Sequence, residues 1–154
     1  RQPPHVTPAR GGGGAGPVAR VSGMTEVTVG ISAVREFTVT DDDTAVALGS
    51  GDVPVLATPR VVAWLEAATV ACLADVLDDG ATSVGTRVDV DHLAASPVGA
   101  HVTAAASVVE IDGRRVAFEV AAEHRLGDGP PVLVANGRVV RAVVDRERFL
   151  SRLP

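Results

Sequence analysis

Apolar residues recur at spacings of three and four between residues 58 and 77, which predicts one long amphipathic helix. The apolar positions in this stretch are Val61, Val62, Trp64, Leu65, Ala68, Cys72, Leu73, Val76 and Leu77. Thr58 is a suitable N-cap, and Pro59 occupies the favoured first helical position. The Asp-Asp-Gly sequence at 78–80 is expected to end the helix.

Alternating apolar and polar residues predict β-strands on both sides of this helix. One strand is expected at 27–40, a glycine-rich loop that could cover a site at 44–56, and strands at 84–95, 101–111, 114–124 and 132–144. Asp112-Gly113 predicts a two-residue hairpin, Asn136-Gly137 a bulge, and residues 145–153 a short terminal helix. This order predicts an α+β fold in which an antiparallel sheet packs on one helix.

Residues 1–23 are expected to form a disordered tail, because four prolines and the glycine run at 11–14 leave little apolar surface to bury. Met24 follows directly and could be the native start of the chain. Residues 24–154 are long enough to form one globular domain with its own core.

The composition narrows the classes of function. The chain is 46% hydrophobic and 21% charged, which is typical of a globular protein, and its net charge of −5 argues against a nucleic-acid surface. No apolar run is long enough to cross a membrane, the N-terminal residues lack the charged-then-apolar pattern of a secretory signal, and one cysteine cannot form an intrachain disulfide. A cytoplasmic location is expected. No metal-ligand spacing or phosphate-binding glycine motif occurs, so neither a metal nor a cofactor is expected.

Glu66 interrupts the apolar pattern of the predicted helix. Its neighbours one turn away are Val62, Ala63, Thr69 and Val70, which places the carboxylate on or beside the apolar stripe. A buried carboxylate needs a partner or a raised pKa, so Glu66 is a candidate functional acid. The alternative is a carboxylate at the edge of the stripe that reaches water.

His92 interrupts the pattern of a strand. Strict alternation over residues 84–95 places it on the same face as Val84, Thr86, Val88, Val90 and Ala94, with Arg87, Asp89 and Asp91 on the other face. An inward imidazole can serve as a general base or as a hydrogen-bonding anchor. The alternative is a core histidine whose hydrogen bonds are satisfied.

Thr58 is a third candidate, because a helix N-terminus offers free N–H groups and partial positive charge to an anion. The alternative is a cap that only satisfies backbone donors. The other candidates are weaker: His5 lies in the tail, His101 and His124 are expected to be exposed near strand ends, and Cys72 is expected to be a small buried residue.

Taken together, these residues resemble a known family. The similar segments are Val55–Thr58, Trp64–Ala67, Val84–Thr86, Val90–His92, Val109–Arg115 and Arg141–Val144. They resemble the fluoroacetyl-CoA thioesterase-like family of hot-dog fold thioesterases, over residues 26–150. The specific part is the joint spacing of the threonine, the glutamate, the glycine and the histidine.

The resemblance implies a hot-dog fold, in which an antiparallel sheet wraps around one long central helix. It also implies an acyl-CoA thioesterase with catalytic residues Thr58, Glu66 and His92, with Gly85 close to the bound acyl group. The active sites would lie at the interface of a homodimer, or of a higher oligomer, and CoA would be part of the substrate. The family's phenylalanine-lined lid has no counterpart at 48–55, where no aromatic residue occurs. We therefore expect the thioester chemistry and not the fluoroacetate specificity.

Several mechanisms are compatible with these residues. Either Glu66 or His92 could activate Thr58 or a water molecule, while backbone N–H groups near Gly85 or the helix start hold the oxyanion. Thr58 and Glu66 are about 12 Å apart along the helix axis, so we expect the substrate, His92 or a partner subunit to bridge them. The rival functions are a non-catalytic acyl-CoA or small-ligand binding protein, an enoyl-CoA hydratase using Asp91 and His92, and a purely structural dimer.

Overall fold

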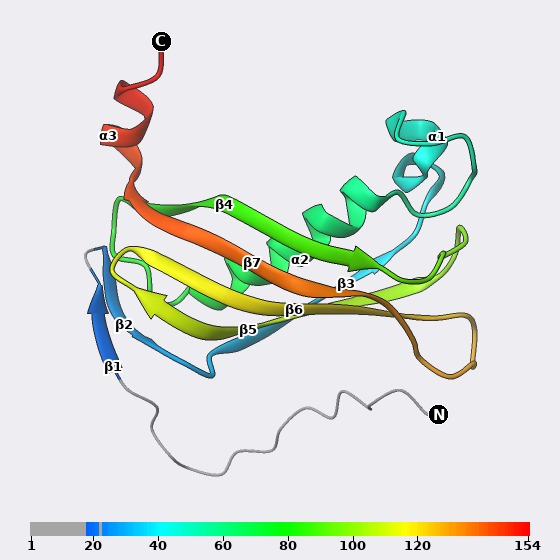
Figure 1. Cartoon of the computed structure of the whole chain (residues 1–154), viewed down its shortest axis with the longest axis horizontal. Coiled ribbons are helices and arrows are strands. Elements are labelled where there is room, and N and C mark those ends of the chain that lie inside the picture. The colour runs from blue at the N-terminus through cyan, green and yellow to red at the C-terminus, as the bar shows by residue number, and fades with distance from the viewer. Residues whose placement is uncertain (1–17, 22) are drawn as a thin grey trace.

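The computed structural model describes residues 18–21 and 23–154. Its elements in chain order are β1 (Val18–Val21), β2 (Met24–Thr28), β3 (Ser32–Thr38), the 3-10 helix η1 (Asp41–Asp43), α1 (Ala45–Leu48), α2 (Thr58–Leu73), β4 (Ala81–His92), β5 (His101–Asp112), β6 (Arg115–Arg125), β7 (Val132–Asp145) and α3 (Arg146–Ser151). Five strands form one antiparallel sheet in the order β3-β5-β6-β7-β4, and α2 runs along one face of it (Figure 1). The predicted α+β layering of one helix on an antiparallel sheet is confirmed.

The core lies between α2 and the inner face of the sheet. The helix buries one stripe, formed by Val61, Trp64, Leu65, Ala68, Thr69, Cys72 and Leu73. This stripe packs on strands whose inward residues alternate along the chain, such as Phe118 and Val120 of β6. The helix ends at Leu73, four residues earlier than predicted, because Leu77 instead pairs with Met24 in an isolated bridge.

The N-terminal part of the fold differs from the prediction. The single strand expected at 27–40 is divided into β2 and β3 by a turn at Gly30, whose φ of 101° favours glycine. In the predicted tail, residues 1–17 and 22 lie outside the described residues. Residues 18–21 form β1, which pairs with β2.

Strand β4 covers residues 81–92, three residues earlier than expected, and it contains a bulge. In the pairing with β7, Gly85 lies opposite Arg141 and Arg87 lies opposite Val140, so Thr86 is an extra residue. An extra residue inverts the alternation of side chains along a strand. The prediction that Val84 and Thr86 share the face of His92 is therefore wrong. On the N-terminal side of the bulge, Gly85 faces the helix.

Two smaller turn predictions also need correction. The hairpin between β5 and β6 turns at residues 113–114, because Asp112 still pairs with Arg115. The bulge expected at Asn136-Gly137 is absent from the described ladder, and the irregularity of β7 lies at Val134. Gly137 is needed for another reason: a Cβ there would lie 2.0 Å from the carbonyl oxygen of Asp89 on β4.

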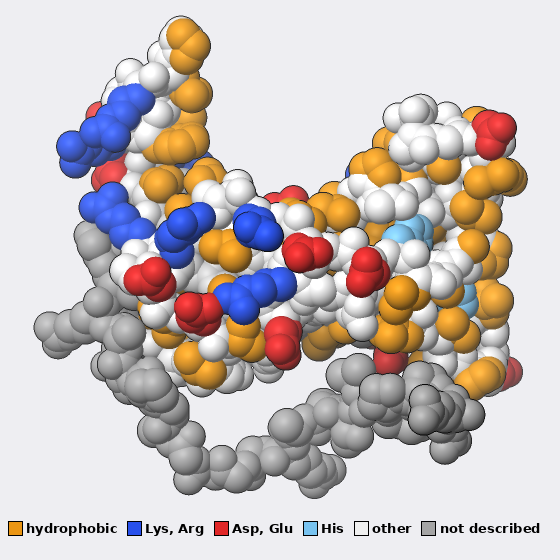
Figure 2. Space-filling model, in the orientation of Figure 1, with side chains coloured by type: hydrophobic (Ala, Val, Ile, Leu, Met, Phe, Trp, Pro, Cys, Tyr) orange, Lys and Arg blue, Asp and Glu red, His pale blue; other side chains and the backbone are white. Residues whose placement is uncertain are grey.

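Two short helices project beyond the β4 edge of the sheet, at its opposite ends (Figure 1). The loop expected at 44–56 contains α1, whose N-cap Thr44 accepts a hydrogen bond from the backbone of Ala47. At the other end, α3 begins after Asp145, which accepts from the backbone N–H of Arg148 at 2.8 Å. Figure 2 shows the hollow between these two projections. Within the described part of the chain, no helix has the length and apolarity to cross a membrane.

Candidate active site

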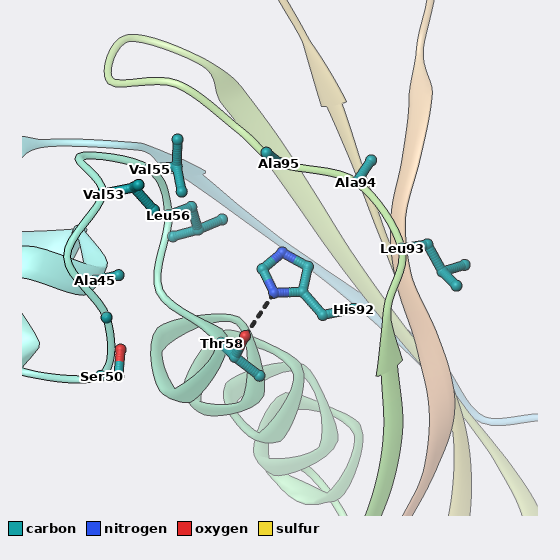
Figure 3. A pocket seen from close by; sticks show the side chains of 11 residues that line it. Ala45, Ser50, Val53, Val55, Leu56, Thr58, His92, Leu93, Ala94 and Ala95 are labelled. Carbon is teal, nitrogen blue, oxygen red and sulfur yellow. Dashed lines mark hydrogen bonds between the residues drawn. The ribbon is translucent and has the colours of Figure 1, made fainter.

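Thr58 and His92 come together although 34 residues separate them. Thr58 begins α2 and His92 ends β4, and the Oγ1 of Thr58 lies 2.7 Å from the Nδ1 of His92 (Figure 3). The prediction that Thr58 is the N-cap is wrong, because Ala57 occupies that position. As the first helical residue, Thr58 directs its hydroxyl to the imidazole.

This pair lines a pocket of about 290 Å³. The other lining residues are mainly small or apolar: Ala45, Ser50, Gly51, Val53, Val55, Leu56, Leu93, Ala94 and Ala95. They come from the α1 loop on one side and from the segment after β4 on the other (Figure 3). The volume is at the small end of ligand pockets, and the lining favours an apolar group next to the two polar side chains.

The environment of His92 favours a neutral imidazole. Burial lowers the pKa of His92 below its usual 6.5, and a weaker backbone interaction with Ala94 opposes this shift. Its Nε2 is buried and has no hydrogen-bond partner among the described residues. A neutral ring can accept the Thr58 proton at Nδ1, which is the arrangement of an activated nucleophile with its base.

Glu66 belongs to a second cluster, on the same face of the sheet. Its Oε2 lies 3.1 Å from Nη1 of Arg141, whose side chain is only 7% exposed, while that of Glu66 is 33% exposed. Arg141 also donates to the Oγ of Ser83 at 2.9 Å and to the carbonyl oxygen of Ser83 at 3.0 Å. The carboxylate is therefore neither buried alone nor free in solvent.

Gly85 allows this carboxylate to lie against the strand. A Cβ at position 85 would lie 2.5 Å from the Oε2 of Glu66, so any larger residue would displace it. The structure thus groups the four predicted residues as two pairs, Thr58 with His92 and Glu66 with Gly85. The pocket is lined by the first pair and not by the second.

Sequence reasoning missed Arg141. Burial lowers the pKa of this guanidinium, and the charge of Glu66 opposes the shift. A signal was present, because Val139, Arg141 and Val143 alternate along β7 and all three are buried. The rule that identified His92 would have placed this arginine on the inner face of the sheet as well.

His124 was expected to be exposed, and this prediction is wrong. Its side chain lies on the inner face of β6 with Phe118, Val120 and Ala122, and the residue is only 4% exposed. The Nδ1 of His124 lies 2.6 Å from the Oγ of Ser96, in the segment that follows β4, and burial lowers its pKa. His101 is exposed and Cys72 is buried, as predicted, while His5 lies outside the described residues.

Metal binding finds no support in these clusters. Among residues 18–21 and 23–154, no three His, Cys, Asp or Glu side chains are grouped so that they could hold a metal ion.

We predict that Arg141→Met lowers the free energy of unfolding by about 1–3 kcal/mol, because it leaves the partly buried Glu66 without its cation. Arg138→Met is the matched control: it lies on the same strand, and its ion pair with Glu110 is about half exposed. It should cost less than about 1 kcal/mol. Urea unfolding measures the stability of both variants. Equal losses of unfolding free energy would contradict the structural role of Arg141.

Comparison with known proteins identifies the family. Residues 39–147 match the fluoroacetyl-CoA-specific thioesterase family. The fluoroacetyl-CoA thioesterase of Streptantibioticus cattleyicolor is 33% identical over 99 residues, which cover 64% of this chain and 68% of that protein. A solved structure of fluoroacetyl-CoA thioesterase is similar with a TM-score of 0.73 and 30% identity, over 83% of this chain and 98% of that one. A hot-dog-like protein from Thermanaerovibrio acidaminovorans gives a TM-score of 0.71 and 28% identity, over 80% and 88%. The chain therefore belongs to the fluoroacetyl-CoA-specific thioesterase family and is a thioester hydrolase of the hot-dog fold.

Proposed function

We propose that the protein hydrolyses an acyl-CoA thioester with Thr58 as the nucleophile and His92 as its base. The observation that carries this proposal is the 2.7 Å contact between the Thr58 hydroxyl and the His92 ring in an apolar pocket. The relatives support the substrate class, since they are named for fluoroacetyl-CoA and one was solved with acetyl-CoA. The lining of the pocket suits an apolar acyl group.

In the proposed reaction, Thr58 Oγ1 attacks the thioester carbonyl while Nδ1 of His92 takes the hydroxyl proton. The carbon–sulfur bond then breaks, and the imidazolium returns the proton to the departing CoA sulfur. Water, deprotonated by the same ring, then attacks the threonine ester. The bond between the acyl carbon and Thr58 Oγ1 breaks, the imidazolium returns the proton to Oγ1, and the carboxylate is released. The positive end of the α2 dipole favours the oxyanion at each stage.

The rival assignment to a hydratase lacks a structural basis. It requires Asp91 and His92 to act on the same substrate, yet Asp91 is exposed and is adjacent to His92 in an extended strand. Neighbouring side chains of a strand point to opposite faces of the sheet. The pairing of His92 with a hydroxyl supports nucleophilic chemistry instead.

We predict that Thr58→Ala and His92→Ala each lower kcat/KM for acyl-CoA hydrolysis by about 10²–10⁴-fold. Thr58→Ser keeps the hydroxyl and should retain most of the activity. The release of CoA is followed with a thiol reagent, using acyl-CoA esters of varied length. His101→Ala is the control, because this histidine is exposed at a strand end. Tight binding of acyl-CoA without turnover in the wild type would instead favour the non-catalytic binding protein.

The pH dependence follows from the environment of His92. Because burial lowers its pKa, the ring stays neutral, and able to accept a proton, to a lower pH than a free histidine would. We expect kcat/KM to be level near neutral pH and to fall in acid, with a midpoint below 6.5. A pH–rate profile of the wild type and of His101→Ala should agree. A midpoint above 6.5 would contradict the assigned base.

The same proposal includes a homodimer joined through β4. This strand has twelve residues and forms an edge of the sheet, pairing only with β7 among the described strands. A long open edge invites pairing with another chain. Antiparallel pairing of β4 with its copy would extend the sheet across two subunits and cover this edge.

Charge favours one register for this pairing. Facing side chains of paired strands point to the same side of a sheet. The two-fold axis that relates the two copies of β4 must therefore pass through a residue, and not between two residues. An axis at Arg87 would oppose two arginines, and an axis at Asp89 would oppose two aspartates. An axis at Val88 sets Arg87 opposite Asp89 of the partner subunit, twice, and is the register we propose.

This register would join the two clusters into one site. If the extra residue at Thr86 is allowed for, Ser83 faces His92 of the partner subunit. The Glu66–Gly85 pair of one subunit then lies beside the Thr58–His92 pair of the other. This explains why the two pairs lie apart within a single chain. Glu66 is proposed to contact the substrate from across the interface.

The single free Cys72, which is buried, is compatible with the cytoplasmic location we propose.

We predict that Asp89→Arg weakens the dimer, because it places two arginines opposite each other on both sides of the axis. The double variant Arg87→Asp/Asp89→Arg should restore dimerisation, since it only exchanges the charges. Sedimentation velocity over a dilution series measures both. Equal association of the single and double variants would reject this register.

A further inference from the structure

The C-terminal helix carries apolar side chains that the described part of the chain leaves exposed. Phe149 is 39% exposed, and Leu150 and Leu153 are more exposed still. All four aromatic residues of the chain lie in its described part. Phe118 is fully buried, and Phe37 stacks on Trp64 with ring centroids 4.5 Å apart. Phe149 is thus the most exposed of the four aromatic rings.

The pocket, in turn, lacks an aromatic side chain over its opening. Its outer wall is the α1 loop, where Val46, Leu48 and Val53 are exposed and no aromatic residue covers the opening. Within one chain, α3 cannot supply this cover, because α3 and α1 stand at opposite ends of the sheet (Figures 1 and 2). The uncovered helix and the uncovered pocket are therefore separated by the length of β4.

From these observations we propose that α3 of one subunit covers the Thr58–His92 pocket of its partner, with Phe149 as the aromatic lid residue. This inference rests on the proposed function, because it uses the β4 dimer and the same active site. A second copy of the chain is the only occupant that it requires.

The strand register brings the two elements together. Asp145, which immediately precedes α3, pairs with Ala81 at the start of β4. In the register centred on Val88, Ala81 faces Ala94 of the partner subunit, a residue of the pocket lining. Two strand spacings of about 4.8 Å then separate Asp145 from that lining, so α3 begins about 10 Å from the partner's pocket.

Charge complementarity supports the same arrangement. The α3 segment carries Arg146, Arg148 and Arg152 against one glutamate, Glu147. The region around α1 carries the acidic run 41–43 and Asp52, of which only Asp43 is paired with an arginine among the described residues. A basic helix with an apolar face fits an acidic rim around an apolar pocket.

Mixing two impaired variants tests the exchange of Phe149 between subunits. His92→Ala removes the base, and Phe149→Ala removes the lid and should lower kcat/KM about tenfold, as for a central interface aromatic. In a mixed dimer, the subunit with an intact His92 receives Phe149 from the subunit that lacks the base. One site per mixed dimer is then complete.

After subunit exchange of equal amounts, we expect about a quarter of the wild-type activity, against about a twentieth if Phe149 acts within its own chain. The lower value, or full activity of Phe149→Ala alone, would overturn the proposal. Leu126→Ala is the control for loss of an exposed apolar side chain in a loop and should leave kcat/KM unchanged.

Cross-linking tests the contact independently of catalysis. A chain with Phe149→Cys and Val53→Cys should form a covalent dimer with a bis-maleimide, and neither single variant should do so to the same extent. Cys72 contributes no background, because it is buried and burial raises its pKa to about 11. Cross-linking of this variant, together with no thioester turnover by the wild-type protein, would support the lid contact while rejecting the catalytic proposal. Absence of the covalent dimer would reject the lid itself.

Discussion

The hydrogen bond between Thr58 and His92 ties the start of the long helix to the end of an edge strand. Everything in the pocket is arranged around this contact, because the α1 loop leads into Thr58 and the segment after β4 leads out of His92. Burial lowers the pKa of the ring and so favours its uncharged form, and its second nitrogen has no partner among the described residues. The fold therefore holds a neutral imidazole against a hydroxyl before any ligand binds.

The second cluster shows a different balance of forces. Arg141 is almost fully buried and relies on Ser83 and Glu66 to replace its lost hydration. The carboxylate is consequently fixed in direction although it is partly exposed. Gly85 leaves the room that this orientation requires. An acid that is held in place but still reaches solvent is suited to meet a substrate at a subunit boundary.

Much of this arrangement could be predicted from the sequence. The helix at 58–77 and the strand pattern gave the layering, and period-two alternation brought attention to His92. Arg141 and His124 obey the same alternation, so their burial was within reach of the rule that found His92. The role of Thr58 was beyond it, because a one-residue shift of the helix start decides whether the hydroxyl caps the backbone or meets the ring.

The extra residue in β4 could not be inferred from hydrophobic pattern at all. Thr86 has an ordinary strand composition around it, and only the pairing with β7 reveals that the ladder skips it. The extra residue shifts the alternation of side chains between the two halves of the strand. Valine and histidine therefore face the helix on the C-terminal side of Thr86, and serine and glycine face it on the N-terminal side. A chain that kept Thr86 but paired it in a regular ladder would turn one half of the strand outward. Gly85 and the imidazole would then lie on opposite faces of the sheet.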